Sequence, residues 1–85
     1  MNIRKINIKV KTIEFDFTGG GRITKKEKQE IIQQTLDTVW EIEEYENEPI
    51  ESEGEMTELL IDRISNETEW LVDDVTYDIL DVENE

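Results

Sequence analysis

The chain has 85 residues, of which 35% are hydrophobic, and a formal net charge of −14. This length predicts one domain, 1–85, whose small core leaves little room for a substrate cleft. The sequence contains neither Cys nor His, which excludes disulfides and thiolate chemistry and removes the commonest general base and transition-metal ligand.

Residues 3–17 alternate between apolar and polar side chains, which predicts a β-strand. The apolar residues of 6–10 have one parity and those of 13–17 have the other. Both sets can lie on one face only if the strand contains a bulge or a turn near Lys11-Thr12. We expect one long bulged strand, because no Gly, Asn or Pro lies at this point. The three glycines at 19–21 then form a flexible turn.

A first helix is predicted to begin at Thr24, which forms a capping box with Glu27 three residues later. Ile31, Ile32 and Leu36 supply its apolar stripe at helical spacing. Residues 38–43 fit either a continued helix or a second strand. Their content of Thr, Val, Trp and Ile favours the strand.

Residues 44–55 form a low-complexity acidic loop. Ser52 and Glu55 form a second possible capping box, and a helix is predicted over about 54–66. Its inward-facing residues would be Met56, Leu59, Leu60 and Ile64. Trp70 opens a last predicted strand, 70–80, in which Leu71, Val75, Tyr77 and Ile79 share one parity.

The predicted fold class is therefore α+β, in the order β-α-β-α-β, with two helices on one face of a three-stranded sheet. The other face would carry Lys9, Asp74, Thr76 and Asp78, so lysines and aspartates become cross-strand partners if the first and last strands pair. The predicted core consists of Ile3, Ile6, Ile8, Val10, Ile13, Phe15, Phe17, Ile31, Ile32, Leu36, Trp40, Leu59, Leu60, Ile64, Trp70, Val75, Tyr77 and Ile79.

Charge is unevenly distributed along the chain. Residues 1–28 carry a net charge of +5, whereas residues 29–85 carry −19 with Arg63 as their single base. Solubility needs a net charge of only about 2–8 in a small domain, and the excess repels itself. Phosphates would also repel this chain, so we expect no direct binding to nucleic acid. A basic protein partner fits the charge, which would steer and accelerate its association.

The sequence offers few residues that could support catalysis or metal binding. Adjacent carboxylates such as Glu43 and Glu44 could serve as an acid–base pair, but a chain with 23 acids contains such pairs by chance. The loop acids do not follow the spacing of a calcium-binding loop. We therefore expect no enzymatic activity, no metal and no cofactor.

The acids of the C-terminal two-thirds are the candidate partner-binding residues. From residue 37 to residue 62 they recur every three or four positions, which would align them wherever the chain is helical. Tyr45, an aromatic among charges, is the candidate contact anchor. The predicted partner-binding residues are Asp37, Glu41, Glu44, Tyr45, Glu48, Glu51, Glu55, Glu58, Asp62, Asp73 and Asp74.

In its size, its acidity and its lack of His and Cys, the chain resembles the small acidic inhibitors encoded by bacteriophages, such as anti-restriction proteins, anti-CRISPR proteins and uracil-DNA glycosylase inhibitors. The resemblance rests on the acidic series from Asp37 to Asp62 and on Asp73, Asp74, Asp78 and Asp81, without a family motif. It implies a DNA-mimicking inhibitor of a nucleic-acid-binding host protein, and no functional residue is transferred from it.

Two other functions stay open at this point. One is an adaptor or inhibitor that binds by shape through Tyr45 or Ile50, with the acids serving solubility and steering. The other is a small enzyme or metal protein. The N-terminus lacks a signal-peptide pattern and no apolar stretch has the length of a membrane span, so we expect the cytoplasm of a bacterial host cell. The sequence leaves the choice between monomer and dimer open.

Overall fold

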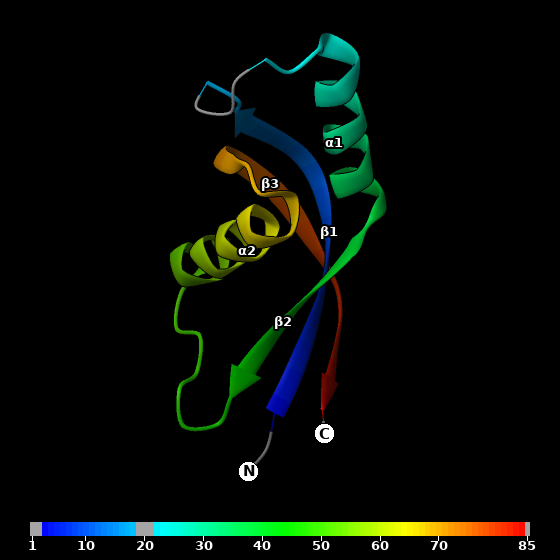
Figure 1. Cartoon of the computed structure of the whole chain (residues 1–85). Helices are drawn as coiled ribbons and strands as arrows, with labels where there is room; N and C mark the ends of the chain where they lie inside the picture. Colours follow the sequence, from blue (N-terminus) through cyan, green and yellow to red (C-terminus); the bar gives the residue numbers. More distant parts are fainter. Residues whose placement is uncertain (1–2, 19–21, 85) are drawn as a thin grey trace.

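The computed structural model describes residues 3–18 and 22–84, and the predicted glycine turn at 19–21 lies outside these ranges. Within them, the elements in chain order are β1 (Ile3–Asp16), α1 (Lys25–Asp37), β2 (Val39–Tyr45), α2 (Glu53–Thr68) and β3 (Leu71–Asn84) (Figure 1). β1 is the central strand and pairs antiparallel with β2 on one side and β3 on the other. The predicted α+β fold and its element order are confirmed.

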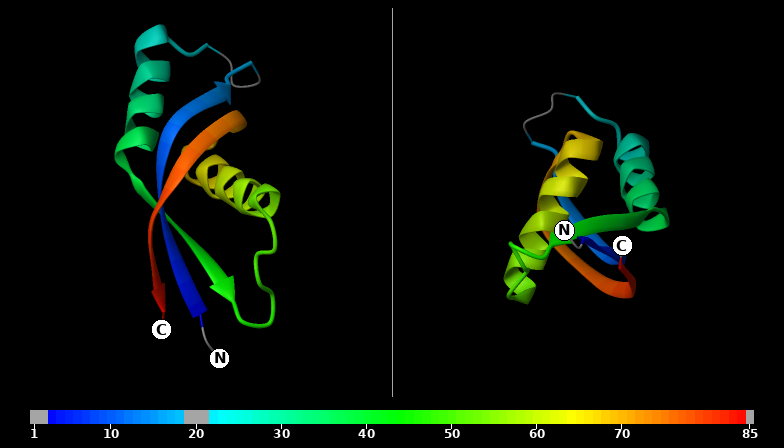
Figure 2. Two further views of the ribbon diagram at one scale, coloured as in Figure 1. Left: turned by 180° about the vertical axis from the view of Figure 1, so that it is seen from behind. Right: turned by 90° about the horizontal axis from the view of Figure 1, so that it is seen from below.

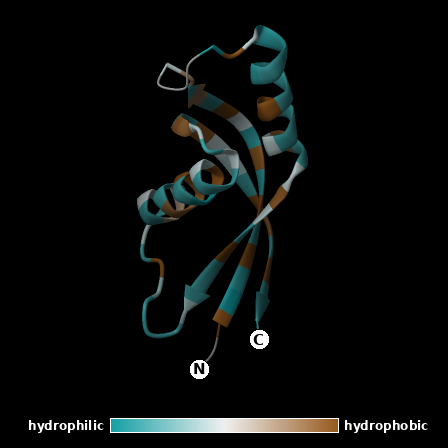
Figure 3. Cartoon of the chain, viewed as in Figure 1, coloured by the Kyte–Doolittle hydropathy of each residue, from teal (hydrophilic) through white to brown (hydrophobic). Residues whose placement is uncertain are grey.

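Both helices lie on the same side of the sheet, as the view from below shows (Figure 2). Their apolar residues face the strands (Figure 3), and the sheet continues past the helices toward the chain termini (Figure 1). One core therefore lies between the two layers, and the opposite sheet face meets solvent. The buried hydrophobic residues are Ile6, Ile8, Val10, Ile13, Trp40, Ile42, Met56, Leu60, Ile64 and Val75.

The predicted bulge in β1 is confirmed. Val10 pairs with Tyr77 of β3 and Thr12 pairs with Thr76, so Lys11 is an extra residue without a partner in that ladder. Because one inserted residue reverses the parity of everything after it, Val10 and Ile13 both point into the core. The change of parity in the sequence is thus the local signal of the bulge.

The helix starts also follow the sequence. Thr24 accepts a hydrogen bond from the backbone N–H of Glu27 at 3.1 Å, and Ser52 accepts one from Glu55 at 3.2 Å. Each hydroxyl satisfies an otherwise unpaired N–H of the first helical turn. α2 ends at Glu69, whose φ of 66° is left-handed and whose N–H donates to the carbonyl of Ser65.

β2 settles the ambiguity over residues 38–43 in favour of the strand. Trp40 and Ile42 alternate into the core and lie opposite Ile8 and Ile6 of β1. The indole N–H of Trp40 donates to the carbonyl of Thr35 at 3.1 Å, which ties the start of the strand to the end of α1. Burial of two large side chains decides this segment, since its local preference is weak.

Two core predictions, Leu59 and Ile79, are wrong, and so is the parity predicted for Leu71. Leu59 is 41% exposed, because it lies on the flank of α2, off the line of Met56, Leu60 and Ile64 that faces the sheet. Ile79 is 53% exposed, because it lies where the sheet extends past the helices. Leu71, predicted to share the inward parity, is exposed because a register shift between Glu14 and Phe15 points its neighbour Val72 inward.

The solvent-facing side of the sheet carries its own compensating charges. Lys9 of β1 lies directly opposite Asp78 of β3, and Lys11 Nζ is 3.7 Å from the same carboxylate. The predicted cross-strand pairing of lysines and aspartates is confirmed. An exposed pair of this kind contributes at most about 1 kcal/mol, but it locally offsets the negative charge of β3.

Candidate protein-binding surface

The outer side of α2 carries a row of carboxylates. Met56, Leu60 and Ile64 fix which side of the helix faces the sheet, and this leaves Glu55, Glu58 and Asp62 on the outside. Residues three or four positions apart on a helix are neighbours, about 5–6 Å between Cβ atoms. The sequence spacing of these three acids therefore becomes a real row on the folded protein.

A groove runs between this helix and the edge strand β2. It consists of two hollows of about 330 and 470 Å³ that share Leu59 and Asp62. Edge-strand residues form one wall, the outer side of α2 forms the other, and the β2–α2 loop closes one end. We call it the acidic groove, and its acidic residues are Glu41, Glu43, Glu48, Glu55, Glu58 and Asp62.

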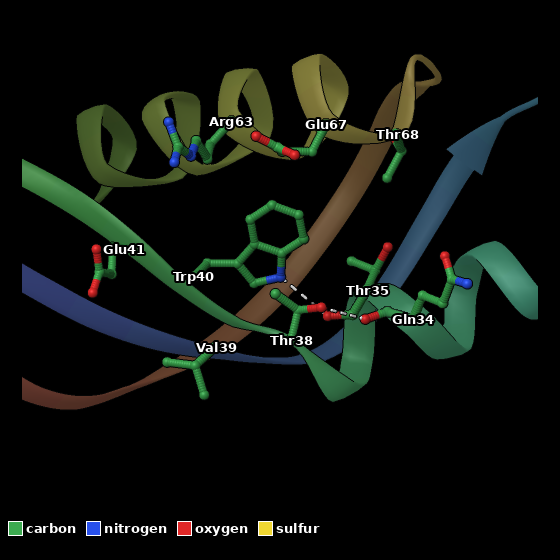
Figure 4. A pocket seen from close by; sticks show the side chains of 9 residues that line it. All are labelled: Gln34, Thr35, Thr38, Val39, Trp40, Glu41, Arg63, Glu67 and Thr68. Atoms are coloured by element: carbon green, nitrogen blue, oxygen red, sulfur yellow. Dashed lines mark hydrogen bonds between the residues drawn. The ribbon is translucent and has the colours of Figure 1, made fainter.

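A further hollow of about 410 Å³ shares Glu41 and Arg63 with the acidic groove and continues it toward the end of α1. Trp40 forms its floor, with Arg63 and Glu67 projecting from α2 beside the indole (Figure 4). The hydroxyl of Thr38 donates to the carbonyl of Gln34 at 2.7 Å. Across the described residues, every buried side-chain nitrogen and oxygen has a hydrogen-bond partner, so this hollow holds no unsatisfied buried group that would orient a substrate.

The acidic groove differs from the sheet face in its electrostatics. Residues 46–62 contain seven acids and no base. In the described part of the chain, no Lys or Arg lies within ion-pair distance of Glu48, Glu55, Glu58 or Asp62, whereas Asp78 has Lys11. The negative charge of these four groove residues is therefore not paired with a base among the described residues, whereas the charge on the sheet is partly offset.

Glu44 corrects the sequence prediction of a partner-contacting carboxylate. It is only 9% exposed and faces the helix side of the sheet. Its carboxylate accepts hydrogen bonds from Arg4 Nη1 at 2.9 Å and from the backbone N–H of Ile50 at 2.8 Å. Glu44 thus joins the start of β1 to the β2–α2 loop and has a structural role.

The expected alignment of the acids from residue 37 to residue 62 is found only on α2. The chain is helical only up to Asp37 and again from Glu53, so the acids between them point in several directions. Asp37 lies at the end of α1 and accepts a hydrogen bond from Gln33 at 3.0 Å. Glu51 borders a different hollow, beneath the first turn of α2.

The remaining predicted residues lie on the strands. Asp73 and Asp74 stand at the start of β3, where Asp74 pairs with Glu14, away from the residues that line the groove. Tyr45 is 38% exposed at the end of β2, and its hydroxyl donates to the Glu43 carboxylate at 2.8 Å. That hydrogen bond, together with the negative charge of Glu43, raises the pKa of Tyr45.

The structure places three residues in the groove that the sequence analysis did not assign to partner binding: Glu43, Leu59 and Arg63. Arg63 had a signal, since it is the single base after residue 28. Among the residues described, no three acids lie close enough together to hold a metal ion. No helix within them is long and apolar enough to cross a membrane.

Comparison with known proteins finds no matching family, no matching curated protein and no matching solved structure.

Proposed function

We propose that this protein is a non-enzymatic acidic inhibitor, encoded by a bacteriophage, that occupies the nucleic-acid site of a host protein such as a CRISPR effector or another DNA-binding enzyme. The observation that carries the proposal is the acidic groove, which is bordered by six acidic residues from β2, the β2–α2 loop and α2. Surfaces that bind nucleic acid are rich in Lys and Arg, and carboxylates in rows present the charge that such surfaces recognise.

The overall charge density supports the same proposal. The net charge of −14 over a long axis of 45 Å corresponds to about one negative charge per 3 Å. Duplex DNA carries one charge per about 1.7 Å of its axis, so this chain reaches roughly half the linear density of DNA. The density is higher along the acidic groove, because the lysines of β1 lie on the sheet.

The shape of the acidic groove suggests how a partner engages it. Lys or Arg side chains entering beside α2 would meet the carboxylates of Glu55, Glu58 and Asp62 and form charge-assisted hydrogen bonds. Leu59 lies among these acids and is 41% exposed, so it offers an apolar contact to the aliphatic stems of the same side chains.

The first experiment identifies and tests a partner. Immobilised protein would be incubated with bacterial lysate at low salt and eluted with a salt gradient, and each captured DNA-binding protein would be purified. We expect 1:1 binding that weakens steeply with salt and that labelled duplex DNA displaces. Binding that is insensitive to salt, or that leaves DNA bound to the partner, would refute the proposal.

The second experiment separates the acidic groove from net charge. One variant carries Glu55→Gln, Glu58→Gln and Asp62→Asn, and its control carries Glu14→Gln, Glu30→Gln and Asp73→Asn. Both sets are exposed and remove three negative charges, so long-range steering changes equally. We expect the groove variant to bind the partner at least tenfold more weakly and the control less than threefold. Equal losses would show that bulk charge, not the acidic groove, is recognised.

The alternative function, binding by shape, requires an apolar contact patch on the surface. Tyr45 bonds Glu43 on one side of β2, whereas Ile50 lies on the helix side of the sheet next to Glu44, so the two do not form one apolar patch. If Ile50→Ala abolished binding while the acidic-groove variant bound normally, the shape-based function would replace the electrostatic one.

A further inference from the structure

A second groove lies on the helix side of the sheet, between the first turn of α2 and the C-terminal half of β3. Its volume is about 340 Å³. We call it the apolar groove, because most of its surface comes from six side chains of β1, β3, α2 and the loop before α2. These are Ile6, Ile50, Met56, Tyr77, Ile79 and Val82.

A bulge in β3 builds one wall of the apolar groove. Ile79 lies opposite Ile8, and Val82 lies opposite Ile6, so Leu80 is the extra residue between them. The insertion reverses parity, which turns both Ile79 and Val82 toward the face that carries the core. The helices do not reach this end of the sheet, and Ile79, Leu80 and Val82 stay 53%, 53% and 38% exposed.

The same residues lie on an open edge. β3 is the outer strand of the order β2-β1-β3, and within the described chain its second edge has no strand partner. Natural edge strands discourage further pairing with Pro, with bulges and with charged side chains, above all Lys. β3 contains neither Lys nor Pro across its 14 residues, and its acids oppose only another acidic strand. Its bulges leave the run Asp74–Ile79 as the regular stretch for pairing.

Charge decides what can occupy this edge. β3 carries five acids and no base, and Glu51 and Glu53 border the apolar groove. Arg4 also borders it, but its charge is already paired with Glu44. A second copy of this chain would place acids against acids across the new strand pair, which is unfavourable. A strand rich in Lys or Arg would place opposite charges there.

We propose that the open edge of β3 binds an extended basic segment of a partner protein, which adds a strand to the sheet and inserts an apolar side chain into the apolar groove. Backbone hydrogen bonds and alternate side-chain contacts are the general basis of such strand addition. The open edge of β3 lies opposite the edge strand β2 along which the acidic groove runs, although Ile50 borders both grooves. The inference therefore does not depend on the proposed function.

The test uses synthetic nine-residue peptides and the unmodified full chain. The first peptide alternates Lys and Val, the second alternates Lys and Ser, and the third alternates Glu and Val. We expect the Lys/Val peptide to bind at least tenfold more tightly than either control, since it alone supplies both charge and an apolar anchor. Backbone amide signals of residues 74–83 should shift and exchange more slowly with solvent in its presence.

Variants then locate the contact. Ile79→Ser with Val82→Ser should weaken the Lys/Val peptide at least tenfold, whereas Leu71→Ser, at the distant end of the same strand, should change its affinity less than twofold. In a variant with Glu58→Gln and Asp62→Asn, in the acidic groove, the Lys/Val peptide should still shift the backbone amide signals of β3. If the variant with Ile79→Ser and Val82→Ser unfolds, the comparison of the three peptides on the unmodified chain still decides whether the edge of β3 binds a basic segment.

Four outcomes would overturn the inference. They are equal binding of the Lys/Ser peptide, amide shifts confined to β2 and α2, absence of binding, and a dimer in sedimentation that Ile79→Ser with Val82→Ser dissociates. The last would identify a second copy of this chain as the occupant. None of the four refutes the proposed function, whose test uses a different partner and different variants; amide shifts confined to β2 and α2 would place the peptide in the acidic groove instead.

Discussion

Glu44→Gln tests whether the buried carboxylate is a structural anchor. In the folded protein it accepts hydrogen bonds from Arg4 and from the backbone of Ile50. The amide keeps the size of the side chain but loses the negative charge. An NH2 group, which donates, replaces one of the two oxygens that accept. Its matched control is Glu58→Gln, the same chemical change at an exposed position of α2.

The magnitude follows from the two contacts. A hydrogen bond to a charged group contributes about 1.5–3 kcal/mol. The Arg4 side chain is 52% exposed, so solvent screening reduces its share to about 1 kcal/mol or less. With the part-buried N–H of Ile50, we expect Glu44→Gln to lower the free energy of unfolding by about 2–3 kcal/mol. A domain of this length has a total of roughly 4–13 kcal/mol, so the loss is substantial.

Urea denaturation measures the effect. With a slope of about 1–3 kcal/mol per molar urea, the midpoint should fall by about 0.7–3 M for Glu44→Gln and stay nearly unchanged for Glu58→Gln. The Ile50 amide should also exchange faster with solvent, because a neutral amide oxygen is a weaker acceptor than the carboxylate. Equal midpoints for the two variants would refute the structural role of Glu44 and return it to the set of partner-binding candidates.

Three further predictions follow from other contacts. The hydroxyl of Tyr45 donates to Glu43, whose charge disfavours tyrosinate, so the pKa of Tyr45 lies above its usual 10.0. The contact therefore stabilises the fold below pH 10.0, and this stabilisation is lost as the pH rises through the raised pKa. Ultraviolet titration in a Tyr77→Phe background should show the pKa falling with Glu43→Gln, and no change would contradict the contact. Trp40→Phe leaves the carbonyl of Thr35 without its indole donor, and urea denaturation should show a loss of about 1–3 kcal/mol; a smaller loss than for an exposed aromatic substitution would count against it. Raising NaCl from about 0.01 M to about 1 M shortens the screening length from about 30 to 3 Å, so the melting temperature should rise as self-repulsion weakens, and a fall would show that attractive pairs dominate.

Much of the secondary structure could be predicted because its signals are local. The bulge at Lys11 is visible as a change of parity, and the caps at Thr24 and Ser52 each involve an N–H three residues away. Such patterns depend on backbone geometry over a few residues. By contrast, residues 38–43 have no decisive local preference, and they become a strand because Trp40 and Ile42 pack against β1.

Prediction of the candidate surface was less complete, because burial and charge pairing depend on contacts between distant residues. Glu44 shares the inward parity of Trp40 and Ile42, but whether a carboxylate is accommodated there depends on its hydrogen bonds to Ile50 and to Arg4, forty residues earlier. Leu59 fits a helical apolar stripe in the sequence, yet the direction in which α2 packs leaves it in the acidic groove. Exposure of Ile79 likewise depends on where the helices end over the sheet.

The sequence by itself determined the total charge, the lack of His and Cys, and the order of strands and helices, since each is a sum or a pattern over nearby residues. Tertiary structure alone decided where on the surface that charge is paired with bases and where it is not. It sets Lys9 and Lys11 against Asp78 on the sheet. In the part of the chain that the structure describes, it leaves Glu48, Glu55, Glu58 and Asp62 without a Lys or Arg within ion-pair distance. The physical reason is that electrostatic energy depends on distances between groups, and only the packing of β1 between β2 and β3 fixes those distances.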